Sequence, residues 1–361
     1  MRPPIKIINK GGCMSVESLS FPTQKQGHRL PVSFRFLLSL YAIMPLCLVI
    51  QLLDQFAFQH VLRDMLPSSP SHFLLFQVLF GTPHIIASNL LLASHWDYLT
   101  AFKSRIIGMS LFIIAFFGIG SLFIPYEVLY VITACWTVYH VLKQQHGIAK
   151  GVCRLPLPAF YLQLGLSVSA GIFIYLGIFM KNSLTQSEAE LVFKIASVLT
   201  IGLLLSTFYC QKYPPDRFGS WFLWANSLLV ISSWYLYGQH YYFLAILIPR
   251  LVHDMTAYSF YVSHDVNRHQ TQPTTGFYKL ADNCRLPVGL VLPLLSFLLT
   301  FLLQAYGDDA VNFITQTLFA TQIYKAVTLG LIGYLALMHY YTEAFVWSAD
   351  SPLRRFIFFV R

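Results

Sequence analysis

The chain has 361 residues, of which 56% are hydrophobic and only 11% are charged, and its formal net charge is +9. Soluble domains carry about 25% charged residues, so this composition excludes an ordinary soluble protein. It indicates an all-α integral membrane protein, because helices satisfy their own backbone hydrogen bonds in lipid. Nucleic acid is not expected as a partner, since the basic residues are scattered among short loops rather than clustered on one face. The expected partners are membrane lipid and a lipophilic small-molecule substrate.

The N-terminal segment, residues 1–33, is polar and basic, and we predict that it is cytoplasmic. No short apolar stretch with a small-residue cleavage site follows it, so a cleaved signal peptide is not expected. The six cysteines show no C-x-x-C spacing. Several lie within apolar runs, where cysteine behaves as a small buried hydrophobe.

Apolar runs of about 17–25 residues predict membrane-spanning helices. Ten such runs occur, at 34–53, 73–93, 105–124, 127–143, 156–180, 191–210, 218–237, 241–263, 286–305 and 319–342. The third and fourth are separated only by Ile124-Pro125-Tyr126, which predicts a tight helical hairpin. We therefore expect one transmembrane domain over 34–345 and a basic cytoplasmic tail over 346–361.

The loop charges alternate along the chain. With the N-terminus inside, the cytoplasmic loops carry Lys103, Arg105, Lys143, Lys150, Arg154, Lys212, Arg217, Arg268, Lys279 and Arg285. The opposite loops hold only Arg63 and Lys181. Because positive residues favour the cytoplasmic side, the pattern predicts a polytopic bundle of about ten spans with both termini inside. A plasma membrane, such as a bacterial inner membrane, is the expected location.

Ionisable residues inside membrane spans indicate function by default. In the second span, His84 follows Gly81-Thr82-Pro83, and Pro83 is expected to kink the helix and free carbonyl groups. Eleven residues later, His95 returns to within about 20° of the same helical face. In the fourth span, His140 and Gln144 form an i, i+4 pair.

The eighth and tenth spans repeat this pattern. His253-Asp254 is followed eleven residues later by His264-Asp265. Asp254 has two open interpretations, as a partner that orients His253 or as an ion pair with Arg250. In the tenth span, His339 and Glu343 are again i, i+4, a spacing that lets imidazole and carboxylate bind one metal ion.

All four spans run from outside to inside in this topology, so their histidines should converge from the membrane centre toward the cytoplasmic end. The predicted metal ligands are His84, His140, His253, His264, His339 and Glu343. Asp254 and Gln144 are the candidate catalytic residues. We expect interfacial positions for His95, His146 and His269, and we assign no role to His28, His60, His72 and His240.

Imidazole with carboxylate suits iron, zinc, copper or manganese. The number of ligands favours iron, mononuclear or dinuclear, and an oxygen-dependent oxidation of a lipophilic substrate such as an isoprenoid or acyl lipid. The Gly81-x-Pro83-His84 element resembles the Brp/Blh family of membrane-embedded carotenoid-cleaving oxygenases. That resemblance implies an iron centre held by histidines, with His84 among them, and a polyene substrate. The H-x-x-H-H boxes of membrane desaturases do not occur.

Three other functions fit the same residues. Helices broken at Pro83 and Pro249, with polar groups near the midplane, are typical of transporters with a His-lined site. Histidine pairs on neighbouring helices can also ligate haem. A metal-free hydrolase or acyltransferase would use histidine as a general base. The sequence does not indicate an oligomeric state.

Overall fold

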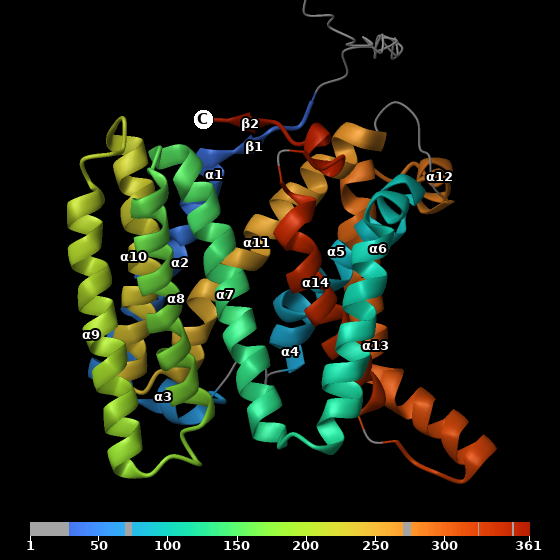
Figure 1. Cartoon of the computed structure of the whole chain (residues 1–361), viewed down its shortest axis with the longest axis horizontal. Helices are drawn as coiled ribbons and strands as arrows, with labels where there is room; N and C mark the ends of the chain where they lie inside the picture. The colour runs from blue at the N-terminus through green and yellow to red at the C-terminus, as the bar shows by residue number, and fades with distance from the viewer. Residues whose placement is uncertain (1–28, 69–73, 270–275, 324, 349) are drawn as a thin grey trace, which may run out of the picture.

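A computed structural model describes residues 29–68, 74–269, 276–323, 325–348 and 350–361, and these are almost entirely helical (Figure 1). The helices are α1 (Phe34–Ser39), α2 (Ile43–Phe56), α3 (Val61–Met65), α4 (Leu74–Phe76), α5 (Pro83–Ala93), α6 (Trp96–Ile113), α7 (Tyr126–Cys153), α8 (Leu157–Phe179), α9 (Gln186–Cys210), α10 (Arg217–Gly238), α11 (Tyr242–His269), α12 (Gly276–Asn283), α13 (Val288–Phe319) and α14 (Ile332–Val346). The all-α prediction is confirmed.

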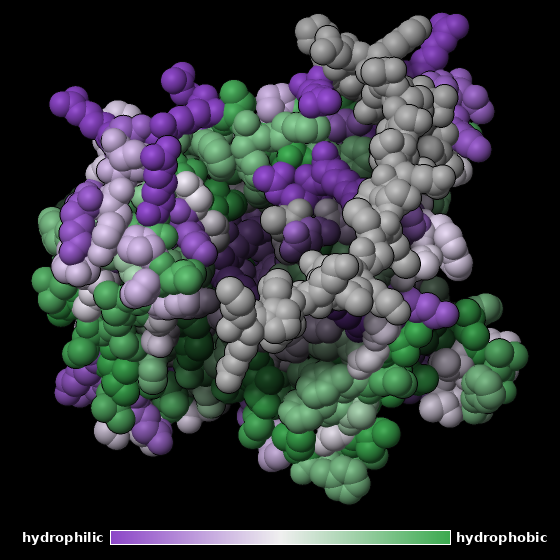
Figure 2. All heavy atoms as spheres, turned by 45° about the horizontal axis from the view of Figure 1, so that its top comes forward, coloured by the Kyte–Doolittle hydropathy of each residue, from purple (hydrophilic) through white to green (hydrophobic). Residues whose placement is uncertain are grey.

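Five helical stretches are long and apolar enough to cross a membrane. They are Phe34–Phe56, Trp96–Leu122, Leu157–Phe179, Gln186–Cys210 and Val288–Phe319. Large apolar side chains on their outer faces are exposed, among them Leu111, Val198 and Leu298. Figure 2 shows such side chains over wide areas of the molecule's flanks. Because water-soluble monomers rarely expose apolar patches of this extent, the surface is consistent with a membrane protein.

Each of the ten predicted runs overlaps a helical segment, but only five stretches of the described chain are long and apolar enough to span a membrane, so the count of about ten spans stays a prediction. Several helix ends also differ from the predicted bounds. Helix α13 continues through Phe319, and helical structure resumes only with the π-helical segment Ala326–Leu331. The Asp308 carboxylate explains this return, since it accepts hydrogen bonds from the Val327 backbone N–H at 2.7 Å and the Thr328 hydroxyl at 2.7 Å. The predicted short connection is present, because helical structure ends at Leu122 and α7 begins at Tyr126, directly after Pro125.

Two groups of helices flank a central pair. Helices α8, α9 and α10 lie on one side in Figure 1, and α5, α6, α13 and α14 lie on the other. Between them run α7 and the long, oblique α11. Helix α11 has contacts with both groups, packing against α10, α5 and α13. The histidines on α11 therefore lie at the junction of the two groups.

The described ends of the chain meet on one face of the molecule (Figure 1). Strand β1 (Val32–Ser33) pairs in parallel with β2 (Phe359–Val360). Leu353 and Ile357 are buried, so residues 350–361 pack against the helices rather than forming a free tail. Of the predicted N-terminal segment, residues 1–28 lie outside the described residues.

Close contact between α8 and α10 depends on Gly177. A Cβ atom added there would lie 1.9 Å from the Tyr237 hydroxyl oxygen, whereas one added at Gly165, on the same helix, would meet nothing within 4 Å. We predict that Gly177→Ala lowers the free energy of unfolding by about 1–3 kcal/mol through overpacking. Gly165→Ala should leave it unchanged or raise it. Thermal unfolding in detergent measures both, and equal effects of the two variants would contradict the predicted contact.

Candidate metal centre

Four helices each contribute one histidine to the centre of the molecule: α5, α7, α11 and α14. Helix α5 begins at Pro83, directly after a π-helical segment, Gln77–Gly81. At this break in the helix, the Gly81 carbonyl accepts a hydrogen bond of 2.8 Å from the partly buried side chain of Arg250 on α11. The predicted irregularity at Pro83 is therefore present, and it places His84 in the first turn of α5, facing α11.

The four imidazole rings form a closed set of edge-to-face contacts. Ring centroids are 5.2 Å apart for His84–His253, 4.8 Å for His253–His140, 4.8 Å for His140–His339 and 4.9 Å for His339–His84. The His253 and His339 rings lie 6.3 Å apart across the set. All four side chains are buried, with at most 6% of their surface exposed. The predicted convergence of these four histidines is what the structure shows.

Most of the ring nitrogens in this group have no hydrogen-bond partner among the described residues. They are both nitrogens of His253, both nitrogens of His339, and Nε2 of His84 and His140. A buried polar group without a partner costs about 1–3 kcal/mol. Because each imidazole offers one nitrogen to an ion, the four rings supply up to four ligand atoms, and a metal ion bound among them would satisfy one nitrogen of each ring.

Glu343 joins the group from α14, one turn beyond His339. Its Oε2 lies 3.5 Å from His140 Nε2 and its Oε1 lies 4.0 Å from His339 Nδ1. The carboxylate also accepts hydrogen bonds from the Tyr261 hydroxyl and from Trp347 Nε1, the latter at 3.1 Å. These donors hold Glu343 in a fixed orientation toward the histidines.

Asp254 adds a second carboxylate, and its position resolves the two interpretations of the sequence. Its Oδ2 lies 3.5 Å from Arg250 Nε, which is the predicted ion pair. Its Oδ1 lies 3.2 Å from Nδ1 of His84, not of the neighbouring His253. Asp254 therefore orients an imidazole on another helix while pairing with Arg250.

Two overlapping sets of side chains have the proximity that one metal ion requires. In His84, His253 and His339, and again in His140, His339 and Glu343, one candidate ligand atom from each residue lies within 4.8 Å of the others. Metal–nitrogen distances are about 2.0–2.1 Å, so ligands of one ion can be up to about 4.2 Å apart. Small side-chain rotations would bring either set onto an ion.

His264 does not belong to this group, which corrects the prediction for that residue. Its Nε2 lies 2.8 Å from the Tyr98 hydroxyl and its Nδ1 lies 3.0 Å from Asp265 Oδ1, so both nitrogens have partners. Eleven residues along α11 correspond to about 16 Å of helical rise from His253. His253 and His264 were predicted to share one face of the helix, but their positions along the helix axis differ too much for them to bind one ion.

The three histidines for which we expect interfacial positions are buried within the protein. His95 is 2% exposed, and His146 and His269 are each 1% exposed. His146 Nε2 lies 2.9 Å from the Ser167 hydroxyl on α8. These side chains are therefore covered by other parts of the protein rather than exposed at its surface.

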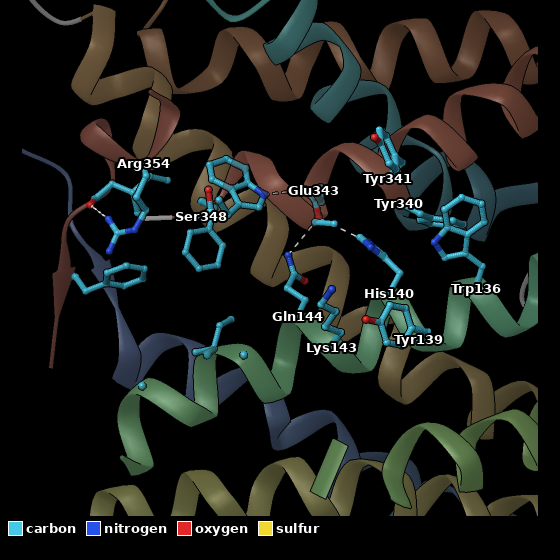
Figure 3. A pocket seen from close by; sticks show the side chains of 18 of the residues that line it. Trp136, Tyr139, His140, Lys143, Gln144, Tyr340, Tyr341, Glu343, Ser348 and Arg354 are labelled. Carbon is cyan, nitrogen blue, oxygen red and sulfur yellow. Dashed lines mark hydrogen bonds and ion pairs between the residues drawn. The ribbon is translucent and has the colours of Figure 1, made fainter. Parts of the chain in front are cut away.

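A cleft of about 680 Å³ reaches the centre between α7 and α14. Of the central group, His140, Gln144 and Glu343 line it. In Figure 3 these three lie between Arg354 and Ser348 at one end and Trp136 at the other. Gln144 Nε2 donates to Glu343 Oε2 at 3.4 Å, as the dashed line in Figure 3 shows. The remaining lining is largely aromatic, with Phe34, Tyr139, Phe260, Tyr340, Tyr341, Trp347 and Phe359.

Sequence reasoning missed three residues that support the centre: Arg250 as the donor to Gly81, and Tyr261 and Trp347 as donors to Glu343. Trp347 stands four residues after Glu343, a spacing that could have indicated the contact. Tyr261 lies on the same face of its helix as His253, but nothing in the sequence predicts that this face packs against α14. Arg250 could be found only by knowing that α11 crosses α5 at Gly81.

Comparison with known proteins adds no assignment. No protein-family model, curated protein or solved structure matches the chain. The chemistry of the centre therefore depends on the residues themselves.

Two buried histidines on α7 provide a matched test of metal binding. His140→Ala removes a member of the central group, and we expect it to lower metal affinity by more than about 100-fold, above the range for partners of ligands. His146→Ala removes a histidine that bonds Ser167, and it should cost about 1–3 kcal/mol of stability while metal affinity is unchanged. Metal titration of the purified full-length variants, read by elemental analysis, measures both. Equal affinities in the two variants would contradict a metal site at His140.

Proposed function

We propose that this protein is a membrane-embedded, metal-dependent oxygenase that oxidises a lipophilic substrate. Non-haem iron, as a mononuclear or dinuclear centre, is the metal class that the ligand set suits best, because imidazole and carboxylate are its usual ligands. Dioxygen is the oxidant. The single observation that carries the proposal is the buried set of four histidines with unpaired nitrogens beside a large apolar cleft.

The residues have separate roles in this proposal. His84, His140, His253 and His339, with Glu343, hold the metal, which supplies the activation of dioxygen when bound. Asp254 is a positioning residue, because it contacts His84 and Arg250 and is not part of the cleft lining. Gln144 lines the cleft and donates to Glu343, so it can contact substrate and orient the carboxylate.

The shape of the cleft favours an elongated apolar substrate. Trp136, His140, Gln144, Gly147 and Gly151 follow one stripe of α7 and all line the cleft. From Trp136 to Gly151 this wall extends over about 22 Å of helical rise. His140 lies within its length rather than at its end, so an acyl or isoprenoid chain lying along α7 would pass the centre with an internal carbon.

Gly147 and Gly151 offer a way to fill the cleft without disturbing the fold. A Cβ atom added at either glycine meets nothing within 4 Å, and the same holds for Gly108 on α6, which does not line the cleft. We predict that Gly147→Leu lowers kcat/KM for the lipophilic substrate by about 10–200-fold, the range for changes of one or a few methylene groups in a pocket. Metal content should be unchanged.

The measurement uses the iron-loaded, full-length protein in nanodiscs with polyene isoprenoids and acyl lipids, with and without an added reductant. Dioxygen consumption and product mass are the readouts. Cleavage of one double bond into two carbonyl products uses both oxygen atoms and needs no reductant, whereas acyl hydroxylation needs two external electrons. Gly108→Leu is the control and should match the unmodified chain. A haem absorption band, or substrate movement across proteoliposomes without oxidation, would replace this proposal with haem binding or transport.

The location in the membrane is part of the proposal. Ten spans with both termini in the cytoplasm, in a plasma membrane such as a bacterial inner membrane, account for the loop charges. One observation supports both termini lying on the same side: β1 and β2 bring the described ends of the chain together. The metal centre would then open through the cleft toward the cytoplasmic side.

Reporter fusions test the topology. Fusions after Lys103, Lys150, Arg217 and Arg285 should be cytoplasmic, because these loops carry the positive charge. Fusions near Glu188 and Asp308 should be external. If the Lys150 and Arg285 fusions lie on opposite sides of the membrane, the ten-span arrangement is wrong, although the metal centre itself would stand.

A further inference from the structure

A second group of buried histidines lies away from the metal centre, where α5 meets α6 and α11 ends. His95 Nε2 and His269 Nε2 face each other at 3.1 Å. On the other side of each ring, His95 Nδ1 lies 2.8 Å from the Leu91 carbonyl oxygen and His269 Nδ1 lies 3.2 Å from the Asp265 carbonyl oxygen. The His269 ring also stacks on the Tyr278 ring, with centroids 3.8 Å apart, which fixes its plane.

These three contacts require more protons than two neutral imidazoles carry. A carbonyl oxygen only accepts, so both Nδ1 atoms must hold the N–H proton. A neutral imidazole has one N–H, and therefore both Nε2 atoms present lone pairs to each other at 3.1 Å. Such a contact is repulsive unless a cation lies between the two nitrogens.

A proton is poorly suited to that position. Both rings are buried, and burial disfavours a charged imidazolium form. Two charged groups lie beside the pair: Arg268, a cation that is paired with Asp97 at 2.9 Å, and the carboxylate of Asp265, which already accepts hydrogen bonds from Tyr278 and contacts His264.

We propose that His95 Nε2 and His269 Nε2 bind a transition-metal ion of the zinc class, at a site separate from the metal centre. With metal–nitrogen distances of about 2.0–2.1 Å, a 3.1 Å separation corresponds to an N–metal–N angle of about 98°, which suits tetrahedral or octahedral ligation. The buried carboxylate of Asp265, the residue whose carbonyl holds His269, offsets part of the ion's charge. Between His253 and His269, both on α11, about 24 Å of helical rise separates the two sites.

His264 provides a matched control within the same group. It is fully buried and its ring lies 5.9 Å from that of His95, yet Tyr98 and Asp265 occupy both of its nitrogens. The substitution His264→Gln should therefore leave metal binding unchanged, whereas His269→Gln should weaken it strongly.

The test removes the metal centre first. Full-length His140→Ala/His339→Ala protein, in which both candidate ligand sets lose His339, is titrated in nanodiscs with Zn²⁺ alone against a chromophoric chelator, and we expect about one equivalent to bind, the number for a single site. Adding His269→Gln should lower the Zn²⁺ affinity by at least about 100-fold, whereas adding His264→Gln should not. Absorption of the Co²⁺-loaded protein reports whether nitrogen ligands change in the same two variants.

Three results would overturn the proposal: no Zn²⁺ uptake by the folded background protein, retention of Zn²⁺ by His269→Gln, or equal loss in His264→Gln. If the double variant does not fold, the titration is carried out on the unmodified chain. His269→Gln must then lower the amount of bound Zn²⁺ by one equivalent. Failure of the metal centre alone has a different signature, because Zn²⁺ would still bind and would still depend on His269.

Discussion

The arrangement of the molecule depends on burying four imidazoles, six of whose eight ring nitrogens have no hydrogen-bond partner among the described residues. His253 and His339 together hold four such nitrogens, and each unpaired buried group costs free energy. Packing of the helices does not by itself require these histidines, because apolar side chains at the same positions would be buried without that cost in free energy. The cluster is therefore explained by a ligand that pairs with several nitrogens at once, and a metal ion is the ligand that imidazole lone pairs suit.

Irregular helix geometry aims these side chains inward. A π-helical segment directly precedes α5, which carries His84, and another directly precedes α14, which carries His339. On α11, Pro249 lies four residues before His253. The two π-helical segments change the helical phase on the N-terminal side of His84 and His339, and π-helical turns are frequent at functional sites. A backbone carbonyl that the irregular segment leaves without a helical partner can accept from a side chain instead, as at Gly81, where Arg250 donates to the carbonyl.

The sequence was sufficient to predict the helices and the core of the site, and the reason is chemical. A histidine in an apolar run is conspicuous, so His84, His140, His253 and His339 could be grouped before their distances were known. Depth along a helix is harder to infer, because helical phase repeats every eleven residues while height does not. His264 shares the face of His253 but lies about 16 Å away along the helix. Contacts between helices, such as Asp254 with His84, depend on crossing geometry that no spacing encodes.

Charge limits how many ions the metal centre can hold. Asp254 and Glu343 contribute two negative charges when ionised, and Arg250 contributes one positive charge close to Asp254. One divalent ion then leaves the buried group at a net charge of +1, whereas two divalent ions leave +3. Uncompensated charge in a low-dielectric interior is costly, so two ions would need further anionic ligands, such as bridging hydroxide. The cleft at His140 and Glu343 is the place where such ligands could enter, which makes a single divalent ion the arrangement that the protein's own residues compensate best.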